Sequence, residues 1–317
     1  MADAGGYVSP AQLRQGHPRV TDLIGSTPLV DLTRVAELRP GVRLLAKLES
    51  KNPGGSVKDR PAWGIVREAL ADGRLGKGQT LLDATSGNTG IAYAMLGAAL
   101  GFAVRLCLPA QASEERRAVL AAYGAEVLLT DPMEGTNGAI REARRLASEG
   151  GAAVFYADQY SNPANWRAHY DTTAVEILQQ TTGEVTHFVA GLGTTGTLMG
   201  VGRRFQRERP GVKLIAVQPD AAFHGIEGLK HLPTAIVPAI YDPTVPDEQL
   251  AVSTEDALRF TRLVARREGI LAGISSGAAL AAALRVAETV EGEATIVVLF
   301  PDGGERYTSQ GLWERPA

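Results

Sequence analysis

Short apolar segments alternate along most of the chain with longer segments in which apolar residues recur every three or four positions. The short segments are rich in Val, Leu and Ile, which is typical of buried strands. The longer ones have the spacing of amphipathic helices. This alternation predicts an α/β fold with largely parallel sheets. We predict strands at 42–49, 79–84, 103–109, 125–130, 153–157, 185–190, 212–219 and 294–302, and helices at 58–75, 90–101, 113–124, 138–150, 173–181, 197–208, 254–269 and 276–290.

Chain length and one break in this pattern predict two domains. A chain of 317 residues corresponds to about two domains of ordinary size. The break lies at 158–165, where Pro163 has an asparagine before it and another soon after it. We therefore predict an N-terminal domain at 1–160 and a C-terminal domain at 161–317. The proline-containing stretch 220–248 is predicted to be mostly loop.

Composition narrows the class of protein. Apolar residues make up 44% and charged residues 21%, as in soluble globular proteins. The net charge of −3 gives no general basic surface for nucleic acid or for an anionic membrane. No apolar run approaches the roughly 18 residues that span a bilayer, and the first residues do not resemble a secretory signal. The single cysteine, Cys107, lies in an apolar run, and we expect it to be buried. We expect a cytoplasmic protein with no metal site.

The segment 187–200 contains a glycine loop between a predicted strand and a predicted helix. Gly191, Gly193 and Gly196 form the pattern G-x-G-x-x-G, which alone is a weak indication of dinucleotide binding. A dinucleotide site requires an acidic residue at the end of the next strand, where this chain has Gln218. A nicotinamide-dependent dehydrogenase is therefore disfavoured.

The same loop has features of a phosphate site. A strand, a glycine loop and a helix together offer free backbone N–H groups and the positive end of a helix dipole. Thr194, Thr195 and Thr197 add hydroxyl groups around the glycines. The composition suits a phosphate monoester, although a turn that binds nothing explains the loop alone equally well.

Lys58 lies in the segment 52–62, at or just before a predicted helix start that Ser56 or Asp59 can cap. The positive end of the helix dipole disfavours a charged lysine there. A neutral, partly desolvated amine is what a Schiff-base lysine needs. The ordinary alternative is a solvated surface lysine.

Two further loops precede helices and carry hydroxyl and amide side chains. In 271–280, Ser275 or Ser276 is either a helix N-cap or a neutral hydroxyl that hydrogen-bonds a ring nitrogen. In 83–90, ordinary capping accounts for one or two of the polar residues, whereas all of them together suit a carboxylate. The polar residues of this second loop are Thr85, Ser86, Asn88 and Thr89.

Together these loops resemble the fold-type II pyridoxal-phosphate enzymes of the cysteine synthase (O-acetylserine sulfhydrylase) group, with motifs similar to those of the B-type isozyme. The resemblance implies two three-layer α/β domains with mostly parallel sheets, as in the tryptophan synthase β subunit, and a segment of about 30–50 that crosses into the other domain. The matching motifs are "IGSTPLV" (24–30), "KLESKNPGGSVKDR" (47–60), "ATSGNTG" (84–90), "DQYSNPAN" (158–165), "THFVAGLGTTGTLMG" (186–200), "EGILAGISSGAAL" (268–280) and "GERY" (304–307).

The resemblance also implies a role for individual residues. Lys58 would hold pyridoxal 5'-phosphate as a Schiff base and act as the catalytic base. Asn88 would bond the ring hydroxyl and Ser275 the pyridine nitrogen. The cofactor phosphate would be bound by Gly193, Thr194, Thr195, Gly196 and Thr197, and the substrate carboxylate by Thr85, Ser86, Thr89 and Gln159.

The activity implied is a β-replacement in a homodimer. L-Cysteine would be made from O-acetyl-L-serine and sulfide, with release of acetate through an α-aminoacrylate intermediate. The negative charge of Asp220 disfavours the phosphate of O-phosphoserine, and Lys230 partly compensates for that charge. Thiosulfate stays open as a sulfur donor. The effect of Asp302-Gly303, where relatives commonly have two serines, is open. A cystathionine β-synthase-like enzyme, a serine/threonine dehydratase and a non-catalytic binding protein stay open as well.

Overall fold

The structure, a computed structural model, describes residues 18–85 and 87–314, which divide into two compact units. Unit 1 contains Lys58–Asn165 and the described residues up to Ile24. Unit 2 contains Gly25–Val57 and the chain from Trp166 onward. The chain therefore enters unit 2 after Ile24, returns to unit 1 at Lys58 and enters unit 2 again after Asn165.

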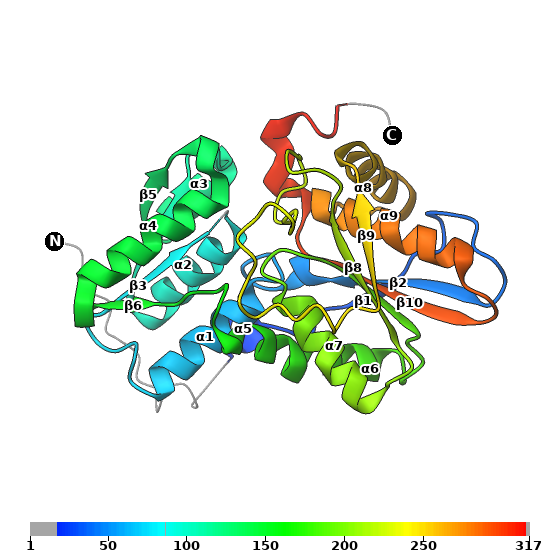
Figure 1. The fold of residues 1–317 in the computed structure, drawn as a ribbon, viewed down its shortest axis with the longest axis horizontal. Coiled ribbons are helices and arrows are strands. Elements are labelled where there is room, and N and C mark those ends of the chain that lie inside the picture. The colour runs from blue at the N-terminus through cyan, green and yellow to red at the C-terminus, as the bar shows by residue number, and fades with distance from the viewer. Residues whose placement is uncertain (1–17, 86, 315–317) are drawn as a thin grey trace. The chain divides into compact units, whose positions relative to one another are not determined.

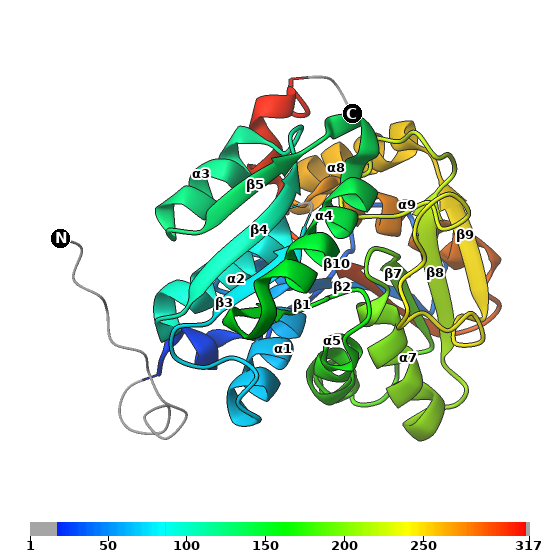
Figure 2. The same cartoon turned by 60° about the vertical axis from the view of Figure 1, so that its left-hand side comes forward.

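Unit 1 is built on a parallel sheet with the strand order β5-β4-β3-β6. The connections β3-α2-β4 and β4-α3-β5 run toward one edge of this sheet, whereas β5-α4-β6 runs back. Right-handed crossovers consequently place α2 and α3 on one face and α4 on the other (Figure 2). The strands are β3 (Thr80–Ala84), β4 (Ala103–Pro109), β5 (Glu126–Thr130) and β6 (Val154–Tyr156), and the helices are α1 (Asp59–Ala71), α2 (Asn88–Leu100), α3 (Glu114–Ala122) and α4 (Gly135–Gly150).

Unit 2 is built on a larger sheet with the order β1-β2-β10-β7-β8-β9, parallel except for β1. Figure 1 shows α6 and α7 on one face of this sheet and α8 and α9 on the other. The strands are β1 (Leu29–Asp31), β2 (Val42–Leu48), β7 (His187–Gly191), β8 (Lys213–Pro219), β9 (Glu248–Val252) and β10 (Ala294–Phe300). The helices are α6 (Ala174–Gln180), α7 (Gly196–Glu208), α8 (Thr254–Glu268) and α9 (Ile274–Thr289), preceded by α5 (Pro163–Ala168), which carries the chain into this unit.

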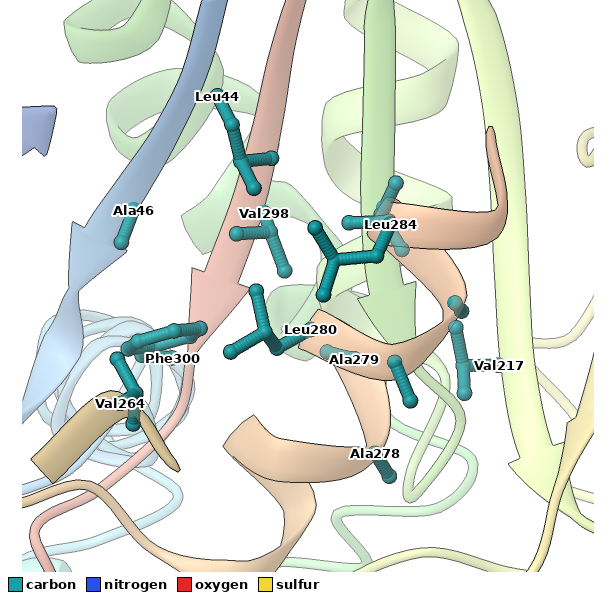
Figure 3. Close-up of a cluster of buried hydrophobic side chains, with 14 of the residues drawn as sticks. Leu44, Ala46, Val217, Val264, Ala278, Ala279, Leu280, Leu284, Val298 and Phe300 are labelled. Carbon is teal, nitrogen blue, oxygen red and sulfur yellow. The ribbon is translucent and has the colours of Figure 1, made fainter. Parts of the chain in front are cut away.

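The core of unit 2 forms where α9 packs on the sheet. Every residue of β10 is buried, as expected for a central parallel strand covered on both faces. Figure 3 shows Leu280 and Leu284 of α9 turned toward this strand, beside Val298 and Phe300. Most of α9 is alanine or another small residue, so its backbone can approach the sheet closely.

The expected alternation of strands and helices is confirmed, with some elements missed. Strands β1 and β9 were not predicted, because β1 is short and β9 lies at an edge with mostly exposed residues. The predicted break at 158–165 ends inside a helix, because α5 begins at Pro163 and is followed by a π-helical turn at His169–Thr173. Cys107 is fully buried, as predicted. Among the described residues, no helix combines the length and apolar character needed to cross a membrane.

Candidate functional site

The loops of unit 2 that carry candidate residues lie at the carboxyl edge of its sheet. Strands β2, β10, β7 and β8 are parallel, so the loops that follow them emerge at the same edge. Backbone hydrogen bonds join these loops: Val57 N donates to Pro301 O at 2.7 Å, and Lys230 N donates to Leu192 O at 2.8 Å. Such an edge is where ligands bind in open α/β sheets.

The glycine loop has the predicted strand–loop–helix geometry. Strand β7 ends at Gly191 and α7 begins at Gly196. Thr195 is the N-cap residue of α7, with a positive φ of 69° and no side-chain capping bond. A Cβ on Gly193 would overlap the carbonyl oxygen of Gly228, so glycine is required there for two backbones to approach. The side chain of the N-cap residue therefore leaves the N–H groups at the start of α7 free of a capping bond of its own.

The hydroxyl groups of this loop fit an anion. The Oγ1 atom of Thr195 is buried and has no hydrogen-bond partner among the described residues. Leaving a buried polar atom unpaired costs about 1–3 kcal/mol, a cost that a bound ligand would remove. Thr194 Oγ1 accepts a weak bond from Gly196 N at 3.4 Å. A phosphate group supplies acceptors both for the Thr195 hydroxyl and for the N-terminus of α7.

One residue that contacts the glycine loop, His169, has no functional role in the sequence analysis. His169 is buried in the π-helical turn, and its Nδ1 atom lies 2.9 Å from Thr173 Oγ1. Its Nε2 atom lies 3.3 Å from Thr197 Oγ1, so the ring connects the turn to the glycine loop. The i,i+4 spacing of His169 and Thr173 was visible in the sequence, but the contact with Thr197 was not. Isolated π-helical turns often occur at functional sites.

The loop before α9 places two serines in the first turn of that helix. The N-cap residue is Gly273, so the interpretation of Ser275 or Ser276 as N-cap is wrong. Both serines are buried, and Ser276 Oγ has no hydrogen-bond partner within the described chain. Ser276 is therefore a second candidate for a ligand contact beside Ser275, which the resemblance singled out.

Asp302, noted as a departure from the family pattern, anchors this same loop. Its backbone carbonyl accepts from Gly273 N at 3.0 Å, and its Oδ2 atom accepts from the Tyr307 hydroxyl at 2.8 Å. A side chain on Gly273 would overlap the Asp302 carboxylate. Asp302 also forms an isolated antiparallel bridge with Ser56. It therefore ties the end of β10 both to the start of α9 and to the segment that leads to Lys58.

In unit 1, Lys58 is the N-cap residue of α1, as the helix pattern predicted. Lys58 itself is the N-cap residue and forms no capping bond through its side chain, so the interpretation of Ser56 or Asp59 as N-cap is wrong. Lys58 is half-buried, and its carbonyl accepts from Ala62 N at 3.0 Å. The placement is suited to a reactive amine at a positive helix end.

Unit 1 also brings three candidate carboxylate-binding residues together. Thr85 Oγ1 accepts from Gly87 N at 2.9 Å and from Gly90 N at 3.1 Å. Thr89 Oγ1 donates to Gln159 Oε1 at 2.7 Å, although the two residues are far apart in the sequence. Gln159 comes close because β6, which precedes it, pairs with β3. Asn88 is the first residue of α2, and Ser86 lies outside the described residues.

Burial displaces the pKa values of two groups near the candidate loops. Desolvation raises the pKa of Asp83, which directly precedes the 84–90 loop, to about 7. Desolvation lowers the pKa of Lys230, on the loop that is hydrogen-bonded to Leu192, to about 8.

Gln218 stands where a dinucleotide site would have an acidic residue. Its Oε1 atom accepts from Leu232 N at 3.2 Å.

Comparison with known proteins groups this chain with one enzyme family. Residues 20–302 match the family model described as "Pyridoxal-phosphate dependent enzyme". A cysteine synthase of Aquifex aeolicus is 49% identical over 305 residues, covering 95% of this chain and 93% of the relative. Cysteine synthase B of Escherichia coli is 43% identical over 290 residues, covering 92% and 94%. The crystal structure of a cysteine synthase from Entamoeba histolytica has a TM-score of 0.90 and 39% identity, covering 99% and 95%.

Proposed function

Since this chain belongs to the pyridoxal-phosphate-dependent enzyme family, we propose that it makes L-cysteine from O-acetyl-L-serine and sulfide and releases acetate. The relatives named cysteine synthase cover nearly the whole chain. The structural observation that carries the proposal is the glycine loop, in which the buried Thr195 hydroxyl has no partner among the described residues and forms no capping bond at the start of α7. That arrangement suits the phosphate group of the cofactor.

The resemblance to this family assigns a role in cofactor binding to individual residues. Gly193, Thr194, Thr195, Gly196 and Thr197 would bind its phosphate. Ser275 would bond the pyridine nitrogen, Asn88 the ring hydroxyl, and the Lys58 amine would hold the aldehyde. When bound, pyridoxal phosphate stabilises the negative charge that develops on the α-carbon of an amino acid.

The remaining chemistry falls to side chains of unit 1. Thr85, Ser86, Thr89 and Gln159 would bind the α-carboxylate and so fix the orientation of the amino acid. The Nζ atom of Lys58, once released by the substrate, would take the proton from the α-carbon and return it after sulfide has added. Because acetate leaves before sulfide enters, we expect ping-pong kinetics.

Thiosulfate is a second candidate for the sulfur donor. The observation that favours it is Lys230, whose buried amine belongs to the loop hydrogen-bonded to Leu192. Asp220, exposed just beyond the end of β8, is unfavourable for the phosphate of O-phosphoserine. Product analysis separates the donors, because thiosulfate would give S-sulfocysteine where sulfide gives cysteine.

We also propose that the working form is a homodimer in the cytosol, as the resemblance implies. The single, fully buried thiol of Cys107 is compatible with a reducing compartment. Sedimentation equilibrium of the cofactor-loaded protein should give twice the mass of the chain. A monomer at micromolar concentration would contradict this part of the proposal.

The first test is the visible spectrum of the purified protein with added O-acetylserine and then sulfide. We expect a cofactor band that changes with O-acetylserine and recovers with sulfide as cysteine appears. Lys58→Ala should abolish cysteine formation, whereas Lys51→Ala, an exposed lysine nearby in the chain, should not. A cofactor band that does not change on addition of O-acetylserine would contradict the choice of O-acetylserine as substrate. The absence of a cofactor band even after addition of pyridoxal phosphate would contradict the role of Lys58.

A further inference from the structure

Gln159 forms four hydrogen bonds within unit 1, two through its backbone and two through its side chain. Its backbone N–H donates to Asp83 Oδ2 at 3.2 Å, and its carbonyl accepts from Asn165 Nδ2 at 2.6 Å. Its side-chain Nε2 donates to Ala84 O at 2.6 Å, and its Oε1 accepts from Thr89 Oγ1 at 2.7 Å. Gln159 is itself buried, so its side-chain position is set by these partners.

Asp83 connects the two strand ends from which these partners come. It lies near the end of β3, is fully buried, and its Oδ1 atom accepts from Ala84 N at 2.8 Å. Its other oxygen accepts from Gln159, which follows the neighbouring parallel strand β6. One carboxylate thus bonds the backbone at the start of the 84–90 loop and the backbone of Gln159. Replacing either oxygen by a donor group would break one of these bonds.

We propose that Asp83 is a positioning residue for the substrate carboxylate, which in its ionised form holds Gln159 and the 84–90 loop in their binding arrangement. The inference rests on the proposed function, because it takes Gln159 and Thr89 to bind the amino-acid carboxylate. Asp83 acts through these residues and has no contact of its own with the reacting atoms. Protonation of Asp83 turns one acceptor into a donor and loosens the arrangement.

The surroundings of Asp83 support a change of charge near neutral pH. Tyr93 from α2, Tyr156 from β6, and Asp158 and Tyr160 after β6 interact with its carboxylate, and Cys107 lies on the adjacent strand β4. Burial raises the pKa of each tyrosine and raises the pKa of Cys107 to about 12, so these groups stay uncharged at neutral pH. Burial, with help from the Asp158 charge, raises the pKa of Asp83 to about 7. Substrate binding should therefore weaken as the pH falls below about 7.

The test is Asp83→Asn in the cofactor-loaded enzyme. Loss of one charge-assisted bond, worth about 1.5 kcal/mol, corresponds to about a tenfold rise in KM for O-acetylserine. We expect kcat, KM for sulfide and the visible band to change little. The dissociation constant of L-cysteine, followed by the visible band, should rise by a similar factor. In wild type, kcat/KM for O-acetylserine should fall with an ionisation near pH 7 that the variant lacks.

A double-mutant cycle separates positioning from a general structural effect. Gln159→Ala should also weaken amino-acid binding, and Asp83→Asn should raise KM less in this background than in wild type, with only the effect through the 84–90 loop left. Cys107→Ala, a buried change on the neighbouring strand, serves as the matched control and should leave both KM and the pH profile as in wild type. If Asp83→Asn fails to fold, the pH profile of Gln159→Ala decides, because the ionisation near pH 7 should change kcat/KM less in this variant than in wild type, and an equal change overturns the inference.

The outcomes distinguish this inference from the proposed function. An Asp83→Asn enzyme that makes cysteine with unchanged KM and an unchanged pH profile overturns the inference and leaves the function intact. Fully additive effects in the double mutant overturn it as well. Wild-type protein that makes no cysteine overturns the proposed function itself.

Discussion

At the scale of single residues, backbone approach and burial set the properties of the candidate site. Gly193 allows the glycine loop to touch the carbonyl of Gly228, which no other residue type permits. Thr195 holds a positive φ, which is uncommon for a residue with a side chain. Such a conformation persists only where the surrounding structure supports it, and it places the buried hydroxyl of Thr195 at the helix start.

Gly193→Ala should weaken binding of the cofactor. The added methyl group overlaps the carbonyl of Gly228, so one of the two backbones must move away from its position. We expect the dissociation constant for pyridoxal phosphate to rise by about tenfold, equivalent to ~1.4 kcal/mol. Cofactor fluorescence during titration measures it. Gly211→Ala, where an added Cβ meets open space, is the control, and equal affinities for the two variants would contradict the expectation.

Asp83→Asn should also change how stability depends on pH. The pKa of Asp83 is raised from 3.8 to about 7, so its stabilising contribution is present below about pH 4 and is lost as the pH rises to about 7. Asn does not ionise, so the variant lacks this loss of stability. The Tm of the variant relative to that of wild type should therefore be higher at pH 8 than at pH 5. Thermal unfolding at these two pH values checks the sign. A difference that does not vary with pH would contradict a buried ionisable Asp83.

At the scale of elements, helices and strands bring side chains to the loops they flank. The π-helical turn His169–Thr173 presents His169 to Thr197 at the start of α7. Gly200 allows this approach, because a Cβ there would overlap the carbonyl of Trp166 and lie close to His169. The turn and α7 therefore form one packed support for the glycine loop.

His169→Phe should weaken cofactor binding without abolishing it. The ring would no longer bond Thr197, so the Thr197 hydroxyl would be less well oriented toward the proposed phosphate. We expect a rise of a few-fold in the dissociation constant for pyridoxal phosphate, and little additional effect in a Thr197→Val background. His231→Phe, at a partly exposed histidine that contacts Thr234 and not Thr197, should behave as wild type. Additive losses in the double mutant would contradict a role through Thr197.

An ion pair between a fully buried lysine and a partly buried glutamate joins β2 to α6 within unit 2. Lys47 Nζ lies 2.7 Å from Glu176 Oε2 and also donates to the carbonyl of Thr27 at 2.6 Å. Lys47→Met leaves the Glu176 carboxylate without its cation, and because this carboxylate is 15% exposed, the cost should lie near or below the lower end of the about 3–5 kcal/mol for breaking a fully buried pair. We expect a clear drop in Tm by calorimetry. Arg43→Met removes the exposed partner of Glu184 and should change Tm very little. Equal drops in Tm for the two variants would be inconsistent with burial as the cause.

At the scale of the whole molecule, each unit carries candidate residues of its own. Unit 2 supplies the glycine loop and the serines of α9, and unit 1 supplies Lys58 and the carboxylate loop. The two sheets share the parallel α/β design, in which loops at the carboxyl ends of strands carry function. The covalent link between Val57 and Lys58 joins the units immediately before the proposed Schiff-base lysine.

Removal of the cofactor should lower the stability of the protein. A ligand that binds the folded form alone stabilises it by about 2.7 kcal/mol when its concentration is a hundred times its dissociation constant. The apo protein should therefore unfold at lower temperature than the holo protein, and adding pyridoxal phosphate should restore the Tm. Calorimetry of apo, holo and restored protein measures the effect. Identical Tm values would contradict specific binding.

The sequence by itself determined the class of fold, most elements and the loops that carry candidate chemistry. These features depend on local periodicity, on glycine and on residue types at fixed spacing, all of which can be read along the chain. Tertiary structure alone decided which distant residues meet. Gln159 lies beside Thr89 and Asp83 because β6 pairs with β3, and His169 lies beside Thr197 because a π-helical turn packs on α7. Strand order and burial arise from packing the whole chain, so the raised pKa of Asp83 and the unpaired hydroxyl of Thr195 have no signature in the local pattern.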